Sequence, residues 1–107
     1  MTVKEFAVKH NMALQTGDGE RQVTAVYCGD LLSIVMGRAP ADSGWVTVMG
    51  NRNAVAVAVL ADVACIILAE NMPLDSECRE KAEAENVAIL TTPLPVYQAA
   101  RLLGDSL

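Results

Sequence analysis

Three short apolar runs, each separated from the next by a longer segment, constrain the fold of this chain most strongly. They are Trp45–Met49, Cys65–Ala69 and Val87–Leu90. The two intervening segments are long enough to be crossover helices, and this spacing is typical of a parallel sheet built from βαβ units. The sequence therefore predicts an α/β fold, with a mostly parallel sheet and flanking helices.

The length of 107 residues matches one domain, so we predict a single α/β domain over residues 1–107. Hydrophobic residues make up 52% of the chain and aromatic residues only 4%. The core must therefore be aliphatic, which suits helices packed on a sheet.

Local signals predict the remaining elements. The expected helices are Val3–His10 behind a Thr2–Glu5 capping box, Leu31–Met36 with Asp30 as N-cap, Asp75–Glu85 with Asp75 as N-cap, and Leu94–Leu103 after Thr91-Thr92-Pro93. The expected strands are Met12–Gln15, before a turn at Gly17-Asp18-Gly19, and Gln22–Cys28. Gly37 and Gly104 are expected to end the helices that precede them. The charges of Asp75–Glu85 are interpreted as a solvated face, not a binding site.

The segment Asn51–Val63 is ambiguous, because its alternating Ala and Val residues fit a strand or a helix. A helix capped by Asn51 is favoured, since the flanking strands need a crossover to lie parallel; a second hairpin is the alternative. From Ala54 to Ala61 such a helix has no polar side, which predicts burial all round. We therefore expect a homodimer with an interface at Val55, Val57, Val59 and Leu60, and the alternative is a monomer with an exposed apolar stripe.

The net charge of -5 disfavours a nucleic-acid partner, because a basic face supplies most of the affinity for phosphate backbones. No apolar run reaches the length of a membrane span, and the first ten residues lack the pattern of a signal peptide. The cysteines Cys28, Cys65 and Cys78 are odd in number and widely spaced, which favours reduced thiols over a disulfide framework. A soluble cytoplasmic protein is expected.

A search for catalytic residues finds almost nothing. His10 is the only histidine, and the cysteines lack the spacing of zinc ligands. The serines have no nearby base, and neither a nucleophile elbow nor a phosphate-binding glycine-rich loop is present. We therefore predict no catalytic residue, no metal and no cofactor, and an enzyme is disfavoured but left open.

One candidate ligand site follows from the predicted topology, because open parallel sheets bind ligands at the carboxyl ends of their strands. The polar residues expected at those ends are Asp30, Asn51, Arg52, Asn53, Glu70, Asn71, Thr91 and Thr92. Arg52 beside a helix N-terminus could hold a small anion such as a nucleotide phosphate. The alternative, which the residue types favour, is that these residues are only helix caps and turn formers.

The segments GERQVTAVYCGDLL, WVTVMGNRNAVAVAVLADVACIILAE and NVAILTTPLPVYQAARLL resemble the DRTGG domain, which is related to the N-terminal domain of HPr kinase. The run VYCGDLLSIVMG is similar to small stand-alone members of anaerobic bacteria, often encoded beside iron-only hydrogenases. The chain departs from the family at Gly50-Asn51-Arg52, where Gly-Asp-Arg is usual, and at Ala69-Glu70-Asn71, where Thr-Gly-Gly is usual. Without the two glycines, we expect the backbone to lose the close approach that a phosphate needs.

The resemblance implies a regulatory or scaffold domain, commonly dimeric, that supplies no catalytic residues to its larger relatives. The predicted function is a non-catalytic regulatory or protein-interaction module, with a protein as a candidate partner. The first alternative is a small-ligand sensor that binds a nucleotide at the strand ends. The second is an accessory protein of iron-sulfur or hydrogenase maturation.

Overall fold

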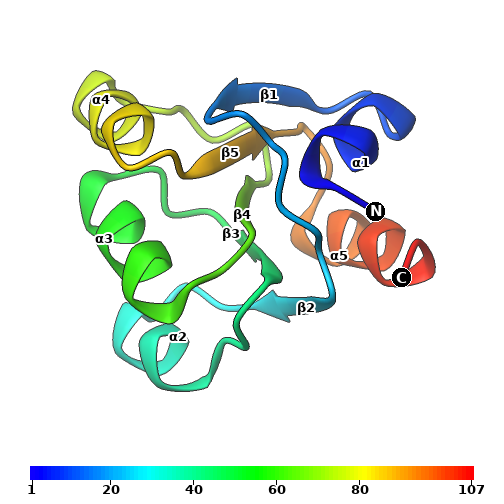
Figure 1. The fold of residues 1–107 in the computed structure, drawn as a ribbon, viewed down its shortest axis with the longest axis horizontal. Helices are drawn as coiled ribbons and strands as arrows, with labels where there is room; N and C mark the ends of the chain where they lie inside the picture. The colour runs from blue at the N-terminus through cyan, green and yellow to red at the C-terminus, as the bar shows by residue number, and fades with distance from the viewer.

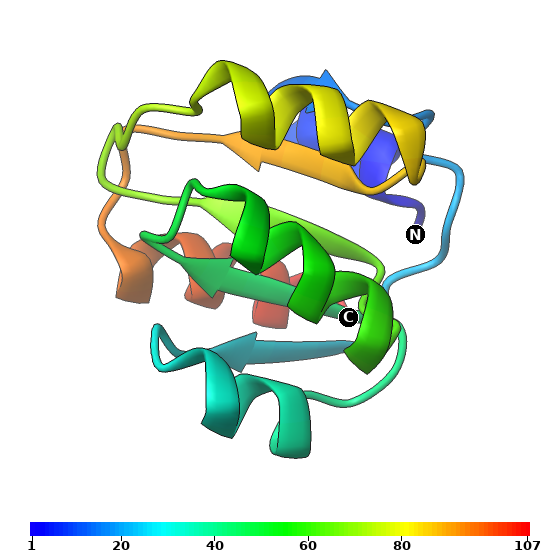
Figure 2. The ribbon, with the colours of Figure 1, turned by 90° about the vertical axis from the view of Figure 1, so that its left-hand side faces the viewer.

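Five strands form one sheet in the order β1-β5-β4-β3-β2 in the computed structural model, which describes residues 1–107. The strands are β1 (Ala13–Thr16), β2 (Ala25–Cys28), β3 (Ser43–Thr47), β4 (Cys65–Leu68) and β5 (Ala88–Thr91). Strands β2 to β5 run parallel, and β1 pairs antiparallel with β5 (Figures 1 and 2). The predicted mostly parallel sheet is confirmed.

Helices cover both faces of the sheet. They are α1 (Val3–Lys9), α2 (Leu32–Arg38), α3 (Arg52–Ala61), α4 (Ser76–Ala84) and α5 (Val96–Asp105). The three crossover helices α2, α3 and α4 pack on one face, while α1 and α5 pack on the other (Figure 2). No helix of the chain has the length and hydrophobicity needed to cross a lipid bilayer.

The central strands divide their side chains between two cores. In β4, Cys65 and Ile67 join the core under α1 and α5, while Ile66 and Leu68 join the core under α3 and α4. All four are buried, which explains why the strand is a continuous apolar run in the sequence.

The N-caps predicted at Thr2, Asn51 and Asp75 are confirmed. Thr2 and Glu5 form the reciprocal capping box, and the Asp75 carboxylate accepts a hydrogen bond from the Cys78 N–H at 2.7 Å. Each cap satisfies a backbone donor that lacks a partner within its helix, so the local sequence determines where these helices begin.

Segment Asn51–Val63 forms a helix, as favoured; a single chain does not bury it all round, so its burial against a partner chain stays a prediction. Val55 and Val57 lie in the core of their own chain, whereas the side chains of Val59 and Leu60 are 43% and 71% exposed. The sheet covers one side of α3, and its neighbours flank it without covering its outer side. Of the four expected interface residues, only Val59 and Leu60 are therefore accessible to another chain.

Three predicted helix ends are also wrong. Asp30 does not cap α2, whose N-cap is Leu31 without a side-chain hydrogen bond, because the Asp30 carboxylate bonds to β3 instead. Gly37 and Gly104 lie inside α2 and α5, not beyond them. Each helix continues for one residue beyond its glycine, so neither glycine ends its helix.

Gly104→Ala is expected to raise the free energy of unfolding by about 0.5 to 1 kcal/mol, because glycine in a helix loses more backbone entropy than alanine. A Cβ atom at Gly104 would meet no heavy atom within 4 Å, so the substitution adds no clash. Urea unfolding followed by circular dichroism measures the change. A lower stability would contradict the helical placement of this residue.

Candidate functional site

The loops that follow β2, β3, β4 and β5 lie together at the carboxyl ends of these parallel strands, on the left in Figure 2. All eight residues predicted as a ligand site lie in or beside these loops. The structure does not bring them together into one site. They fall into three groups with different partners.

The first group is Asp30, which joins the ends of β2 and β3. Its Oδ1 atom accepts hydrogen bonds from the buried Thr47 hydroxyl at 2.7 Å and from the Val48 N–H at 3.0 Å. Both bonds are made inside the chain, so they hold the loop after β2 against β3. Asp30 is a structural tie here, and its Oδ2 atom has no partner.

The second group closes the loops after β4 and β5 onto each other. The N–H groups of Glu70 and Asn71 donate to the carbonyl oxygens of Leu94 at 2.9 Å and Thr92 at 3.0 Å. The Thr92 hydroxyl accepts from the Leu94 N–H at 3.2 Å, and the Thr91 hydroxyl accepts from Gln15 at 2.9 Å. These backbone donors are already used, so they are not free to bind a phosphate.

Glu70 and Asn71 both adopt left-handed backbone conformations, with φ angles of 61° and 55°. Glycine takes this conformation without strain, whereas a side chain such as that of glutamate costs about 1 to 2 kcal/mol there. The conformation accounts physically for a glycine pair at these positions in the Thr-Gly-Gly pattern. In this chain the two side chains point outward and are exposed.

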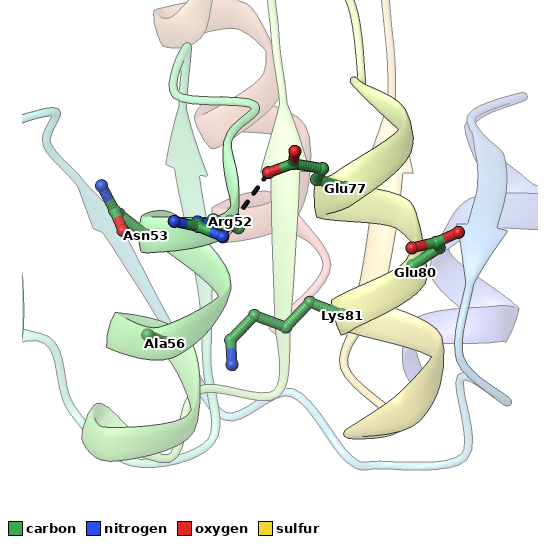
Figure 3. A pocket seen from close by; sticks show the side chains of 6 residues that line it. All are labelled: Arg52, Asn53, Ala56, Glu77, Glu80 and Lys81. Atoms are coloured by element: carbon green, nitrogen blue, oxygen red, sulfur yellow. Dashed lines mark ion pairs between the residues drawn. The ribbon is translucent and has the colours of Figure 1, made fainter.

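The third group opens onto a groove between α3 and α4. Arg52 and Asn53 line it, and Asn51 caps the same end of α3 by accepting from the Ala54 N–H at 3.1 Å. The full lining is Arg52, Asn53 and Ala56 from α3 with Glu77, Glu80 and Lys81 from α4 (Figure 3). Its volume is about 670 Å³, which lies within the range of about 300 to 1,000 Å³ for small-molecule sites.

The groove carries two cations and two carboxylates. Arg52 Nη1 lies 3.6 Å from Glu77 Oε2, and this exposed ion pair bridges the two helices (Figure 3). Lys81 projects between the helices one turn below and has no acidic partner within 4 Å. An anion between Arg52 and Lys81 would also face the N-terminal end of α3, where the helix dipole favours negative charge.

The α4 side of this groove was missed in the sequence, where Asp75–Glu85 was interpreted as a solvated face only. Helices α3 and α4 follow consecutive parallel strands and therefore lie side by side on one face. That rule places the first turns of both helices at the same edge. A search for charges facing Arg52 across this gap would have found Glu77.

The three cysteines do not meet. Cys65 and Cys78 are buried on opposite faces of the sheet, and Cys28 is exposed on the edge strand β2. Burial raises the pKa of Cys65 to about 12 and that of Cys78 to about 11. Partial burial and then the charge of Asp30 raise the pKa of Cys28. No three His, Cys, Asp or Glu side chains lie close enough together to hold a metal ion.

A second polar cluster lies at the amino ends of β3 and β4, where Arg21 joins the two turns that precede these strands. Its guanidinium pairs with the carboxylates of Asp42 and Asp62 and donates to the Val63 carbonyl at 2.9 Å. Asp42 and Asp62 have left-handed φ angles of 62° and 59°. All the hydrogen bonds that the Arg21 guanidinium donates are accepted by residues of these two turns, so the arrangement is structural.

Sheet order and layering define a small α/β domain, with an open groove between two of its crossover helices. A family model described as the DRTGG domain matches residues 9–106, and the chain belongs to this family. No curated protein matches the chain.

A solved structure has the same fold: the CBS and DRTGG domains of the regulatory region of Clostridium perfringens pyrophosphatase, complexed with its activator diadenosine tetraphosphate. The TM-score is 0.76 at 16% sequence identity, and the match covers 99% of this chain. This chain spans 47% of that one.

Proposed function

We propose that this chain is a non-catalytic regulatory module that acts as a homodimer. The observation that carries the proposal is the fold shared with a pyrophosphatase regulatory region over 99% of this chain. Family membership over residues 9–106 supports the same assignment. In this proposal the domain passes on a binding event to a partner and does not transform a substrate.

The homodimer is supported by large apolar side chains that the chain leaves exposed on its crossover helices. Leu31 and Ile34 at α2 are 63% and 45% exposed, and Leu60 on α3 is more exposed than either. Light scattering at micromolar concentration tests the proposal, because a dimer has twice the chain mass of 11.4 kDa. A mass of one chain at every concentration would overturn it.

A second candidate function, nucleotide sensing, is favoured by the groove between α3 and α4. An anionic phosphate would pair with Arg52 and Lys81 and displace Glu77 from Arg52, which breaks the ion pair that bridges the two helices. Loss of the Arg52–Glu77 pair would let phosphate binding change the spacing between α3 and α4. The related pyrophosphatase regulatory region was solved with diadenosine tetraphosphate, which makes adenine nucleotides the first ligands to test.

Thermal unfolding with diadenosine tetraphosphate, ATP and AMP tests this candidate. Ligand at a hundredfold excess over Kd stabilises the folded state by about 2.7 kcal/mol, which raises the Tm of a domain this size by roughly 10 °C. Arg52→Ala and Lys81→Ala are each expected to reduce the shift to a third or less. Arg101→Ala is the matched control, since Arg101 is an exposed arginine paired with Asp105 on α5.

An unchanged shift in Arg52→Ala would place any nucleotide elsewhere. No shift with any of the three nucleotides would count against nucleotide sensing and leave the dimeric module intact. The third candidate, an accessory role in iron-sulfur or hydrogenase maturation, finds less support because the three cysteines of one chain do not converge.

A further inference from the structure

Helix α2 exposes one face that combines apolar, charged and small residues. The face consists of Ile34, Gly37 and Arg38, which their spacing of three and four residues places on one side of the helix, together with the N-cap Leu31 and the preceding residue Asp30. We refer to these five residues as the α2 face. Val35, on the other side, is the only residue of α2 that is fully buried. Leu31 and Ile34 therefore remain exposed outside the core of the chain.

The position of α2 makes this face accessible. Strand β2 is the last strand of the sheet and pairs only with β3. Figures 1 and 2 both place α2 at the outer corner of the molecule beside β2. A second molecule that approaches this edge meets α2 first.

The other edge strand, β1, is protected against association with a second chain, whereas β2 is not. Strand β1 has an irregular register at Leu14 and Thr16, and Arg79 donates to the Gln15 carbonyl at 3.1 Å. Irregular strands and charged side chains of this kind keep edges from associating. Residues 25–28 of β2, by contrast, contain no charge and no proline.

The charges of this region favour a second copy of the same chain. Residues 22–41 hold one acid, Asp30, and one base, Arg38, so their net charge is zero within a chain of net charge -5. Arg38 has no acidic partner within 4 Å, and Asp30 Oδ2 accepts no hydrogen bond. The two unpaired charges lie at opposite ends of the helix.

The α2 face is complementary to itself under two-fold symmetry. When two antiparallel copies of α2 are centred on Ile34, position 31 of one copy faces position 37 of the other, and the Arg38 end of each helix lies beside the start of the other helix. Leu31 then meets Gly37, and Arg38 approaches the Oδ2 atom of Asp30, the carboxylate oxygen that is not used within the chain. A Cβ atom at Gly37 would contact nothing within 4 Å in its own chain, so the glycine leaves open space there.

We propose that a second copy of this chain packs on the α2 face, with the two α2 helices antiparallel and Ile34 on the two-fold axis. The Leu31 side chain of each copy fills the space above Gly37 of the other, and the Asp30 and Arg38 pairs set the register. This inference rests on the homodimer proposed above and identifies its surface. It replaces the α3 surface that the sequence predicted.

Two substitutions test the surface by light scattering and sedimentation over a range of concentrations. Ile34→Glu brings two like charges together on the axis and is expected to weaken dimerisation by about 100-fold or more. Gly37→Leu fills the space for Leu31 and is expected to weaken it by about tenfold or more. The matched controls are Val8→Glu, at a site 79% exposed on α1, and Gly104→Leu, at a second open helical glycine.

A cross-link gives an independent measurement. Ile34→Cys in a Cys28→Ser background leaves only buried native thiols, so an oxidant should form a covalent dimer through position 34. Val8→Cys in the same background should stay monomeric on a non-reducing gel. Circular dichroism checks that each variant is folded.

The outcomes separate the two proposals. Dimers that survive Ile34→Glu and Gly37→Leu would overturn the α2 face and leave the homodimer standing. A wild-type chain that is monomeric at every concentration would overturn both. A dimer that is lost in both variants, kept in both controls and cross-linked through position 34 would support the α2 face.

Discussion

Trp45→Ala is expected to lower the free energy of unfolding by about 4 kcal/mol, the largest loss from any single side chain of this domain. Trp45 is fully buried on β3, in the core under α2, α3 and α4. Alanine would leave a cavity that the surrounding aliphatic side chains cannot fill without moving. Its Nε1–H also donates to the Gly29 carbonyl at 2.8 Å, and that bond fixes the connection from β2 to α2.

Trp45→Phe separates the packing from the hydrogen bond. Phenylalanine keeps most of the buried ring but cannot donate to Gly29, so we expect a loss of about 2 kcal/mol. Circular dichroism in urea is the suitable measurement, because Trp45 is the only tryptophan and its fluorescence disappears with it. All variants must be compared at one protein concentration, since dimerisation would add stability by mass action. Equal losses for both variants would mean that the cavity is not the main cause.

The sheet could be predicted from the sequence because its central strands are short runs of apolar residues. Strand β4 and the first three residues of β5 are covered on both faces, so these residues are apolar without interruption. The caps at Thr2, Asn51 and Asp75 could be predicted for the same reason, since each bond joins residues three apart. Signals that act over a few residues are visible in one sequence.

The error at Asp30 arose because distant residues compete with a local signal. Asp30 has the chemistry of an N-cap, but its carboxylate bonds instead to Thr47 at the end of β3 and to Val48 just after it. The groove was half predicted for a similar reason. Arg52 follows from its place after β3, whereas Glu77 faces it only because two crossover helices pack side by side.

The sequence alone does not show which valines of α3 face the sheet, so the expected interface included two that are buried in their own chain. Val55 and Val57 turn inward, and the outer side of the helix carries Ala56 and the exposed Leu60. Burial of Val55 and Val57 needs no partner, and the exposed outer side of α3 is smaller than the expected interface. The charge and spacing of the α2 face carry the dimer argument instead.

Gly17→Ala is expected to lower the free energy of unfolding by about 3 kcal/mol, through two separate costs. Gly17 follows β1 with a left-handed φ of 74°, which strains any residue that has a Cβ atom. That Cβ would also lie 2.9 Å from the backbone N and Cα atoms of Ala88 at the start of β5. Backbone cannot rotate away as a side chain can, so β1 and β5 would have to separate.

Gly19→Ala isolates the first cost. Gly19 has nearly the same φ, 69°, but its Cβ would approach only side-chain atoms and one backbone nitrogen, at 3.1 to 3.2 Å. We expect it to lose about 1 kcal/mol, so the difference of about 2 kcal/mol between the two variants measures the collision with Ala88. Urea unfolding of both variants under the same conditions gives this difference. Equal losses would show that strand β1 can move away from β5, and that the antiparallel edge of the sheet is softer than its parallel centre.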